Sequence, residues 1–176
     1  MDAYRCLICG ETYMGKGKPS NCPFCGAKAV YIVEADRWKD ENMDMELSDA
    51  SKKNLERSLQ LEVDNAPFYR DAMARTSDVE LQGIFKYLSK VEAEHASVIR
   101  KMLKCEVPQP GREESQASDD DKKNLTTAHA REVAASTLYK KFAGDAIEPR
   151  VRKVFTALSE IESDHIDIEG RLLARR

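Results

Sequence analysis

The sequence contains no long apolar run, no large basic patch and no recognisable export signal. In 176 residues, no apolar stretch approaches the ~20 residues that a membrane helix needs, and the N-terminus lacks a basic region followed by an apolar one. The net charge is −3, so nucleic acid is not an expected partner. We expect a soluble, cytoplasmic protein with no membrane partner, built as one domain or as one domain with a small module.

Cysteine is nearly absent after residue 25, and four of the five cysteines form two Cys-x-x-Cys pairs within residues 1–25. In a cytoplasmic chain this spacing indicates metal binding rather than disulfides. A glycine follows each pair, which suits the positive φ often needed after a cysteine knuckle. Residues 1–36 bury too little surface to fold alone, so a bound ion would stabilise them. The predicted ligands, for either iron or zinc, are Cys6, Cys9, Cys22 and Cys25.

The rest of the chain repeats itself at an offset of 70 residues, with Glu62-Val63 matching Glu132-Val133 and similar pairs elsewhere. The repeat predicts two related helical hairpins. In each half, apolar residues recur at spacings of three and four, as on the buried face of a helix. Helix starts are indicated by Ser48, Ser77 and Ser118 as capping residues, and by Pro149 in a first turn.

The connection between the hairpins, residues 105–117, is long enough to run the length of the bundle, ~40 Å if extended. Such a long crossover is used by ferritin-like folds. We therefore predict a mainly α chain, in which a ferritin-like four-helix bundle follows the cysteine module. The predicted parts are a four-cysteine module over 1–36, a polar linker over 37–47, and a bundle over 48–176 with hairpins 48–104 and 118–174.

Each hairpin contains one Glu-x-x-His pair and a further glutamate 30 residues before it. Glutamate and histidine three residues apart share a helical face, and this set of side chains on four helices is the ligand pattern of ferritin-like di-iron and di-manganese proteins. Four buried carboxylates without cations would cost several kcal/mol each or take up protons. Carboxylate-rich ligands favour iron or manganese. The predicted ligands of this two-metal site are Glu62, Glu92, His95, Glu132, Glu162 and His165.

Several other side chains lie near this predicted site. Tyr69 and Tyr139 each follow a predicted ligand by seven residues, so each lies two turns away on the same helical face. Each is either a core aromatic residue or a hydroxyl that bonds a ligand carboxylate. His129 precedes the third-helix glutamate by one turn, and we expect it not to be a ligand. Pro67 lies inside the first helix, where we expect a bend.

With both motifs identified, the sequence resembles the rubrerythrin family over nearly its whole length. The cysteine pairs look like a rubredoxin-type iron site, which favours iron over zinc there, and the Glu-x-x-His motifs look like the family's di-iron site. The cysteine module stands first, as in reverse-order members. Typical members have an extra glutamate three residues after the third-helix ligand. Here that position is Ala135, so the six-ligand set also resembles the centre of bacterioferritin.

This resemblance implies a peroxidase that protects a low-oxygen cell. Two ferrous ions would reduce hydrogen peroxide to water, and the rubredoxin-like site would return electrons from a reductase that uses NAD(P)H. The implied catalytic residues are the six predicted ligands with Tyr69 and Tyr139. Family members commonly form homodimers in which one subunit's rubredoxin module approaches the other's di-iron site. Two alternatives stay open: a ferroxidase or oxygen-reducing protein, which Ala135 favours, and a non-catalytic scaffold containing zinc throughout.

Overall fold

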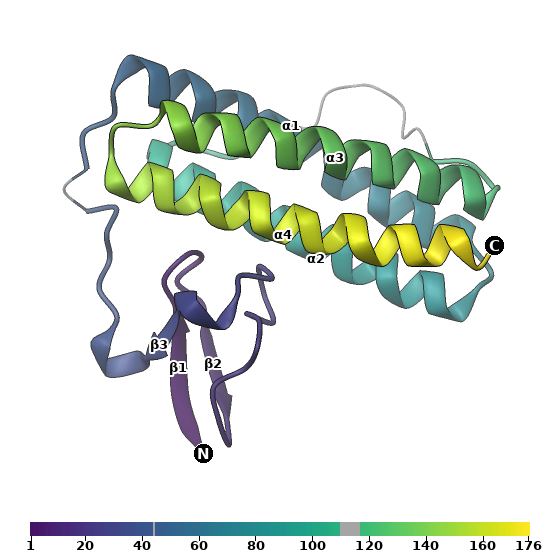
Figure 1. Cartoon of the computed structure of the whole chain (residues 1–176), viewed down its shortest axis with the longest axis horizontal. Coiled ribbons are helices and arrows are strands. Elements are labelled where there is room, and N and C mark those ends of the chain that lie inside the picture. The colour runs from purple at the N-terminus through teal and green to yellow at the C-terminus, as the bar shows by residue number, and fades with distance from the viewer. Residues whose placement is uncertain (44, 110–116) are drawn as a thin grey trace.

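The computed structural model of the chain describes residues 1–43, 45–109 and 117–176. These residues form a small module of strands and 3-10 helices, followed by long helices that lie side by side (Figure 1). The fold is mainly helical, as predicted. The module contains β1 (Asp2–Cys6), β2 (Thr12–Gly15), η1 (Ala29–Tyr31), β3 (Ile32–Glu34) and η2 (Ala35–Arg37). The helices of the bundle are α1 (Asp49–Arg75), α2 (Val79–Leu103), α3 (Asp121–Asp145) and α4 (Pro149–Ala174).

The module is an antiparallel sheet with β1 in the centre, in the order β2-β1-β3. Each cysteine knuckle ends in a glycine whose amide donates back to the first cysteine carbonyl: Gly10 to Cys6 at 3.0 Å and Gly26 to Cys22 at 2.9 Å. The φ angles of these glycines are 84° and 81°. This left-handed conformation is strained for any residue with a Cβ, which explains why glycine follows each cysteine pair.

The helix starts are partly as predicted. The Ser48 side chain caps α1 by accepting from the Ser51 amide at 3.3 Å, and α4 begins with Pro149. The predictions of Ser77 and Ser118 are wrong, because α2 is capped by Asp78 and α3 by Asp120. An ionised carboxylate accepts amide hydrogens as well as a hydroxyl does and also interacts with the positive end of the helix dipole.

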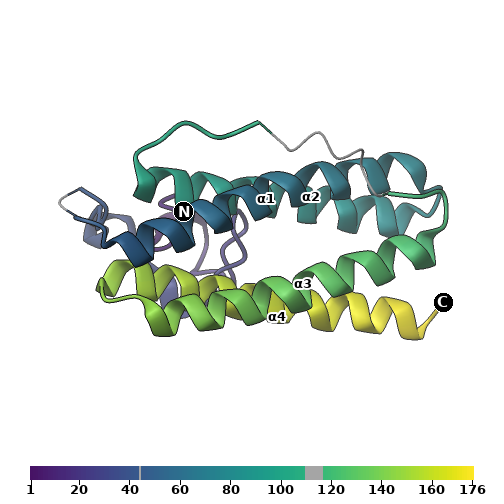
Figure 2. The ribbon, with the colours of Figure 1, turned by 90° about the horizontal axis from the view of Figure 1, so that it is seen from above.

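The helices form two hairpins, α1 with α2 and α3 with α4 (Figure 2). α2 ends at one end of the bundle and α3 begins at the other, so the chain between them spans the length of the bundle. This confirms the predicted long crossover. Residues 110–116 of the crossover and Asp44 of the predicted linker lie outside the described residues. Across the described ranges, no helix has the combination of length and apolarity that crossing a bilayer requires.

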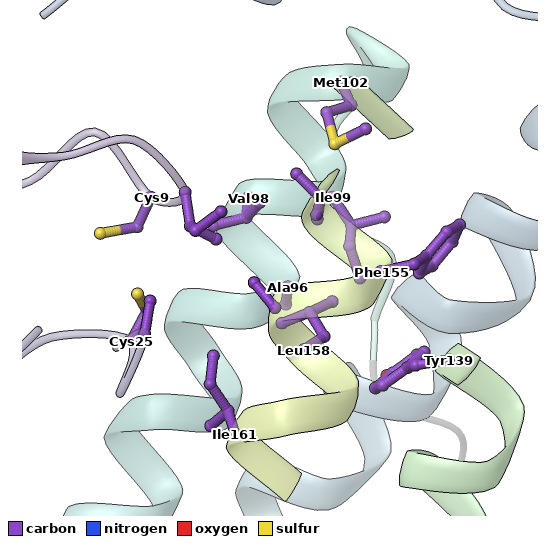
Figure 3. Close-up of a cluster of buried hydrophobic side chains, with 14 of the residues drawn as sticks. Cys9, Cys25, Ala96, Val98, Ile99, Met102, Tyr139, Phe155, Leu158 and Ile161 are labelled. Atoms are coloured by element: carbon purple, nitrogen blue, oxygen red, sulfur yellow. The ribbon is translucent and has the colours of Figure 1, made fainter. Parts of the chain in front are cut away.

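The module lies against α2 and α4 of its own chain (Figure 1). One apolar cluster includes Cys9 and Cys25 of the module together with Val98 of α2 and Ile161 of α4, as Figure 3 shows. A Cβ on Gly26 would lie 3.0 Å from Cγ2 of Ile161, so any other residue at this contact would require Ile161 to shift. The cysteine knuckles are therefore part of the same buried core as the helices.

Two basic side chains of the bundle fasten the first knuckle. The guanidinium of Arg150, only 8% exposed, donates to the carbonyls of Leu7 at 2.6 Å and Ile8 at 2.8 Å. The ammonium of Lys101 donates to the carbonyl of Cys9 at 3.2 Å. Hydrogen bonds from charged donors to buried carbonyls are stronger than neutral ones, so these contacts hold the module in place on the bundle.

The chain over 37–47 also contacts both parts. The indole of Trp38 donates to the carbonyl of Cys6 at 3.0 Å. Glu41 accepts from the ammonium of Lys153 on α4 at 2.6 Å. The segment predicted as a polar linker is thus fastened at the module and at the bundle.

Candidate metal centres

The four predicted cysteine ligands converge on one point. Their sulfur atoms all lie within 4.8 Å of one another, with Cys6 Sγ 3.8 Å from Cys25 Sγ and Cys9 Sγ 3.7 Å from Cys22 Sγ. A tetrahedron of ~2.3 Å metal–sulfur bonds has edges of about 3.8 Å. All four are free thiols, and all are buried. The geometry therefore fits one tetrahedral metal ion.

Hydrogen bonding to Cys22, together with burial, raises the pKa of the Cys25 thiol well above its ordinary value. The thiolate is the form that binds metal, so a bound cation would reverse this shift. The backbone amide of Ile8 points at Cys6 Sγ at 3.4 Å, and that of Glu11 at Cys9 Sγ at 3.5 Å. These amides would stabilise the negative charge of a metal–thiolate site.

The bundle brings all six predicted ligands together in its interior. They form two groups of ligand atoms within 4.8 Å of one another, and Glu92 and Glu162 belong to both groups. Glu62 and His95 complete the first group, and Glu132 and His165 complete the second. The glutamates are fully buried, and His165 is 3% exposed. The arrangement fits two ions, both of which the two shared carboxylates would help to hold. The second group is Glu92, Glu132, Glu162 and His165.

The polar atoms at the centre of this site lack hydrogen-bond partners. Both carboxylate oxygens of Glu92 and of Glu162 are buried without one. Nδ1 of His165 lies 2.9 Å from Glu162 Oε2, and Nδ1 of His95 lies 3.3 Å from Glu162 Oε1, but neither pair has hydrogen-bond geometry. Each buried polar atom left unpaired costs about 1–3 kcal/mol. Metal ions would supply the missing partners, so the residues fit a dimetal centre.

The electrostatics of the site carboxylates also favour binding of a cation. Burial, and then the charge of neighbouring glutamates, raises the pKa of Glu92 well above its ordinary value. Burial and the charge of Glu162 raise the pKa of Glu132 to about 7. Burial would also raise the pKa of Glu162, but the positive charge of His95 and the contact with His165 lower it. Without metal the site holds protons, and binding of ions would release them.

The two tyrosines bond candidate ligands across the bundle. The hydroxyl of Tyr69 donates to Glu132, and the hydroxyl of Tyr139 donates to Glu62. Each tyrosine therefore contacts the glutamate of the opposite hairpin. Both hydroxyls are buried, so of the two interpretations the structure favours a hydroxyl that orients a ligand carboxylate.

The remaining predictions around the site concern its neighbours. His129 belongs to neither group of candidate ligands, as expected. Ala135 is buried and offers no ligand atom, and its counterpart Asn65 accepts from Arg131 at 2.9 Å. Pro67 lies inside α1. The site is thus formed by six candidate ligands without a seventh carboxylate from this part of α3.

Sequence reasoning missed a fifth buried glutamate, Glu169 of α4. It is 0% exposed, and its Oε1 lies 3.1 Å from the hydroxyl oxygen of Tyr69. Burial, and then the charge of Glu132, raises its pKa to about 9. The repeat hides this residue, because its counterpart is Ile99. The available signal was its spacing, since it follows Glu162 by seven residues on the same helical face.

A hydrogen bond joins the two candidate metal centres. Nε2 of His95 lies 3.0 Å from the backbone carbonyl oxygen of Cys25. A carbonyl can only accept, so Nε2 carries a hydrogen, and in the neutral ring the lone pair of Nδ1 is then free to bind an ion. One predicted ligand of the bundle site is thus bonded to the backbone of a predicted ligand of the cysteine site.

A groove of about 380 Å³ lies where the module meets α2 and α4. Its wall includes Asn21 and Gly26 of the module, Tyr87 of α2 and His165 of α4. His165 is also a candidate ligand, so the groove reaches the outer edge of the dimetal site.

Comparison with known proteins agrees with this architecture. The model of the ferritin-like domain family matches residues 51–173. Reverse rubrerythrin-1 of Clostridium acetobutylicum is 30% identical over 169 residues, which cover 88% of this chain and 89% of that protein. Among solved structures, none matches the chain at a significant level. With its four-cysteine module ahead of a bundle that gathers Glu and His from four helices, the chain belongs to the ferritin-like family and, within it, to the rubrerythrins of the reverse type.

Proposed function

We propose that this protein is a di-iron oxidoreductase that reduces hydrogen peroxide to water in the cytoplasm of a low-oxygen cell. The observation that carries the proposal is the 3.0 Å hydrogen bond between Cys25 and His95. It supports electron transfer between the two centres, which iron storage or a structural metal would not need. Hydrogen peroxide, two electrons and two protons give two molecules of water. When bound, a pair of iron ions supplies the two electrons by changing from the +2 to the +3 state.

The chain's own residues hold and connect these centres. Glu92 and Glu162 would help to hold both ions, because they belong to both groups of candidate ligands, and His95 would hold an ion with Nδ1. The same imidazole donates from Nε2 to the Cys25 carbonyl, which fixes the ring orientation and its tautomer. An electron leaving the cysteine site would cross one hydrogen bond and one imidazole ring. A partner reductase that oxidises NAD(P)H would supply the cysteine site.

The groove beside His165 supports a small oxidant. Its volume of about 380 Å³ exceeds what hydrogen peroxide needs. His165 lines the groove, whereas the other candidate ligands are fully buried. A larger substrate would require the helices to part, whereas peroxide or oxygen would not.

A second candidate function is oxidation of ferrous iron or reduction of oxygen. The observation that favours it is Ala135, which leaves the site without the extra glutamate of typical rubrerythrins. Both functions use the same six ligands, and they differ in the preferred oxidant and in the need for the cysteine site. As part of the proposal for either function, we expect a homodimer.

The test is single-turnover oxidation of the anaerobically reduced, iron-loaded protein, mixed separately with hydrogen peroxide and with oxygen. We expect the reaction with peroxide to be faster by at least about tenfold. Equal or faster oxidation by oxygen would replace the peroxidase with the second function. Failure to bind iron, or reaction with neither oxidant, would leave only a zinc-binding scaffold.

Double replacement of Cys9 and Cys25 by serine separates the two functions further. For a peroxidase, steady-state turnover with an NAD(P)H-dependent reductase should collapse, whereas single-turnover oxidation of the bundle iron should persist. Unchanged steady-state turnover would mean that electrons reach the bundle without the cysteine site.

A further inference from the structure

The two cysteine knuckles differ in the side chains that bond their backbone carbonyl groups. In the first knuckle, the consecutive carbonyls from Leu7 to Gly10 all accept hydrogen bonds from lysine or arginine side chains, at 2.6 to 3.2 Å. Arg150 bonds the first two, Lys101 bonds the third and Arg5 bonds the fourth. Arg150 lies on α4 and Lys101 on α2, whereas Arg5 belongs to the module. The bundle thus supplies positive charge to this knuckle.

The second knuckle is bonded differently. The carbonyl of Cys25 bonds the imidazole of His95 at 3.0 Å, and that of Gly26 accepts from the side-chain amide of Asn21 at 3.1 Å. Among the residues that the structure describes, no lysine or arginine side chain donates to a carbonyl of residues 22–26. The lysine and arginine side chains that bond the cysteine module from the bundle therefore gather at one knuckle.

These cations share a small pocket with one of the cysteine ligands. The pocket has a volume of about 170 Å³, and its lining includes Cys9 together with Arg5, Lys101 and Arg150. Arg150 is 8% exposed, whereas the side chain of Lys101 is 38% exposed. Because solvent screens an exposed charge more than a buried one, Arg150 has the stronger effect on the cysteine site.

Carboxylates face the same cations at longer range. Glu41 Oε2 lies 3.8 Å from Nη1 of Arg150, and Glu11 Oε1 lies 3.9 Å from Nζ of Lys101. Asp40 also lines the pocket and is exposed. The side chains of Glu41 and Glu11 are more exposed than that of Arg150, so solvent screens their negative charge more strongly. The buried charge beside the knuckle is therefore positive.

Reduction adds one negative charge to the cysteine site. Four thiolates around an iron ion carry one net negative charge when the ion is in the +3 state and two when it is in the +2 state. No bond forms or breaks when the electron arrives, and no proton moves. A fixed positive charge nearby stabilises the more negative state, and net charge and hydrogen bonds are among the properties that set the potential of an iron–sulfur site. Arginine does not lose its proton in proteins, so its effect is permanent.

We propose that Arg150, with a smaller contribution from Lys101, raises the reduction potential of the cysteine site while the module is docked on the bundle. The proposal rests on the oxidoreductase function proposed above, in which a reductase supplies electrons to this site. Arg150 is a positioning residue, because it acts through the backbone of Leu7 and Ile8.

Docking and reduction are then linked. If docking strengthens the binding of the electron by some factor, the electron strengthens docking by the same factor. The module is therefore held most firmly against the bundle when it carries the electron that passes to His95. Once that electron has left, the contact with Arg150 becomes weaker.

The experiment is redox titration of the iron-loaded protein with dithionite and potassium ferricyanide, in the presence of mediator dyes. The absorption of ferric iron bound by thiolates is lost on reduction and reports on the cysteine site. In Arg150→Met the equilibrium constant for electron uptake should fall by about tenfold or more, which lowers the midpoint potential by about 59 mV or more. In Lys101→Met the fall should be smaller. An unchanged midpoint potential in Arg150→Met would overturn the proposal. Lys141→Met, at an exposed position on α3, is the control and should keep the original potential.

Two further variants separate charge from packing. Arg150→Lys keeps the charge but has fewer donors, so its potential should stay closer to that of the unchanged protein than to that of Arg150→Met. Glu41→Gln removes a carboxylate that faces Arg150, so its potential should rise. Equal falls in Arg150→Lys and Arg150→Met, or a fall in Glu41→Gln, would show that the potential follows packing and not charge.

Hydrogen exchange tests the linkage to docking. The backbone amides of residues 1–36 should exchange more slowly in the dithionite-reduced protein than in the ferricyanide-oxidised one, and Arg150→Met should abolish this difference. Equal exchange in both states of the unchanged protein would contradict the linkage. A difference that is as large in Arg150→Met would arise from the bundle ions instead.

These measurements need neither peroxide nor a reductase. If the cysteine site takes up no electron at any potential, delivery of electrons through it is excluded and the proposed function fails. If the site is reducible but Arg150→Met keeps the original midpoint potential, only the role of Arg150 is wrong. The two failures are therefore distinguishable.

Discussion

At the scale of single residues, each of the six candidate ligands has at least one buried polar atom without a hydrogen-bond partner. Such atoms destabilise the metal-free fold and favour metal binding, because the same atoms that are costly without ions are the ones that hold them. Two of the six ligands, Glu92 and Glu162, differ from the others because each contributes to both groups of ligand atoms.

The consequence is a predicted difference in metal content. Glu162→Ala should lose both ions of the bundle, whereas Glu132→Ala should preferentially lose one, because only the first residue is shared by both groups. Metal analysis per chain checks this, and the ion of the cysteine site serves as the internal standard. Glu94→Ala is the control and should retain full occupancy. Equal metal content in all three variants would contradict the ligand assignment.

Removal of metal should also change which protein is more stable, the unchanged protein or the Glu92→Leu variant. In the metal-free protein, Glu92→Leu removes two unpartnered buried oxygens and should raise the free energy of unfolding by about 1–3 kcal/mol. In the metal-loaded protein the same change should lower it, because a ligand is lost. Denaturant unfolding with and without a chelator measures both values. The same sign in both states would mean that the site is not a metal site.

At the scale of elements, the sequence predicted the helices better than their ends. Spacing and repeat found both hairpins, yet α2 and α3 begin at Asp78 and Asp120 rather than at the serines beside them. Several neighbouring residues can cap, and the choice depends on where the preceding turn packs. Glu169 was missed for a related reason, because comparison of the two halves finds only what both halves share.

The start of α1 makes a testable electrostatic contact with Glu148, the residue that precedes α4. The carboxylate of Glu148 accepts from the Ser48 amide at 2.6 Å and the Ser51 hydroxyl at 2.5 Å. Burial would raise the pKa of Glu148, but these hydrogen bonds outweigh it and lower the pKa to about 2. The carboxylate therefore stabilises the fold above its ordinary pKa, and this contribution is lost as the pH falls towards 2.

Glu148→Gln should accordingly lower the free energy of unfolding by about 1 kcal/mol at pH 7. The difference from the unchanged protein should shrink as the pH falls from about 4.5 to about 2. Chemical denaturation across this range measures it, with the exposed Glu56→Gln on α1 as the control. A difference that grows on acidification would reverse the assigned sign.

At the scale of the whole molecule, the position of the module was beyond sequence reasoning. Local patterns identified both metal sites but contain no information on which surface of the bundle the module covers. The structure places it through Arg150 and through the contact of Cys25 with His95. The resemblance implied delivery between subunits, whereas the contact described here lies within one chain.

Arg150→Met should loosen this docking while leaving both metal sites filled. The variant removes hydrogen bonds to Leu7 and Ile8, and bonds from charged donors contribute about 1.5–3 kcal/mol each. We expect slower electron transfer from the cysteine site to the bundle, followed by stopped-flow absorbance. Lys141→Met, an exposed position on α3, is the control. An unchanged rate would mean that Arg150 does not hold the productive arrangement.

Mixing two inactive variants distinguishes delivery within a chain from delivery between subunits. The Cys9→Ser, Cys25→Ser protein lacks the electron source, and Glu162→Ala lacks the bundle ions. If electrons cross the Cys25–His95 contact within one chain, refolding the two proteins together should restore no turnover with a reductase. Restored turnover in the mixture would establish exchange between subunits instead.

If electrons cross the contact between Cys25 and His95, as we propose, this contact also determines a rate law. The hydrogen bond of 3.0 Å between His95 Nε2 and the Cys25 carbonyl joins two centres on one chain, however few molecules surround them. Electron exchange between these centres would then be first order, with a half-time that dilution does not change. Only the encounters with the reductase and the oxidant would depend on concentration. In a cell with few copies of this protein, the total rate of turnover would fall in proportion to the number of copies, but the rate constant of electron transfer within each chain would not change.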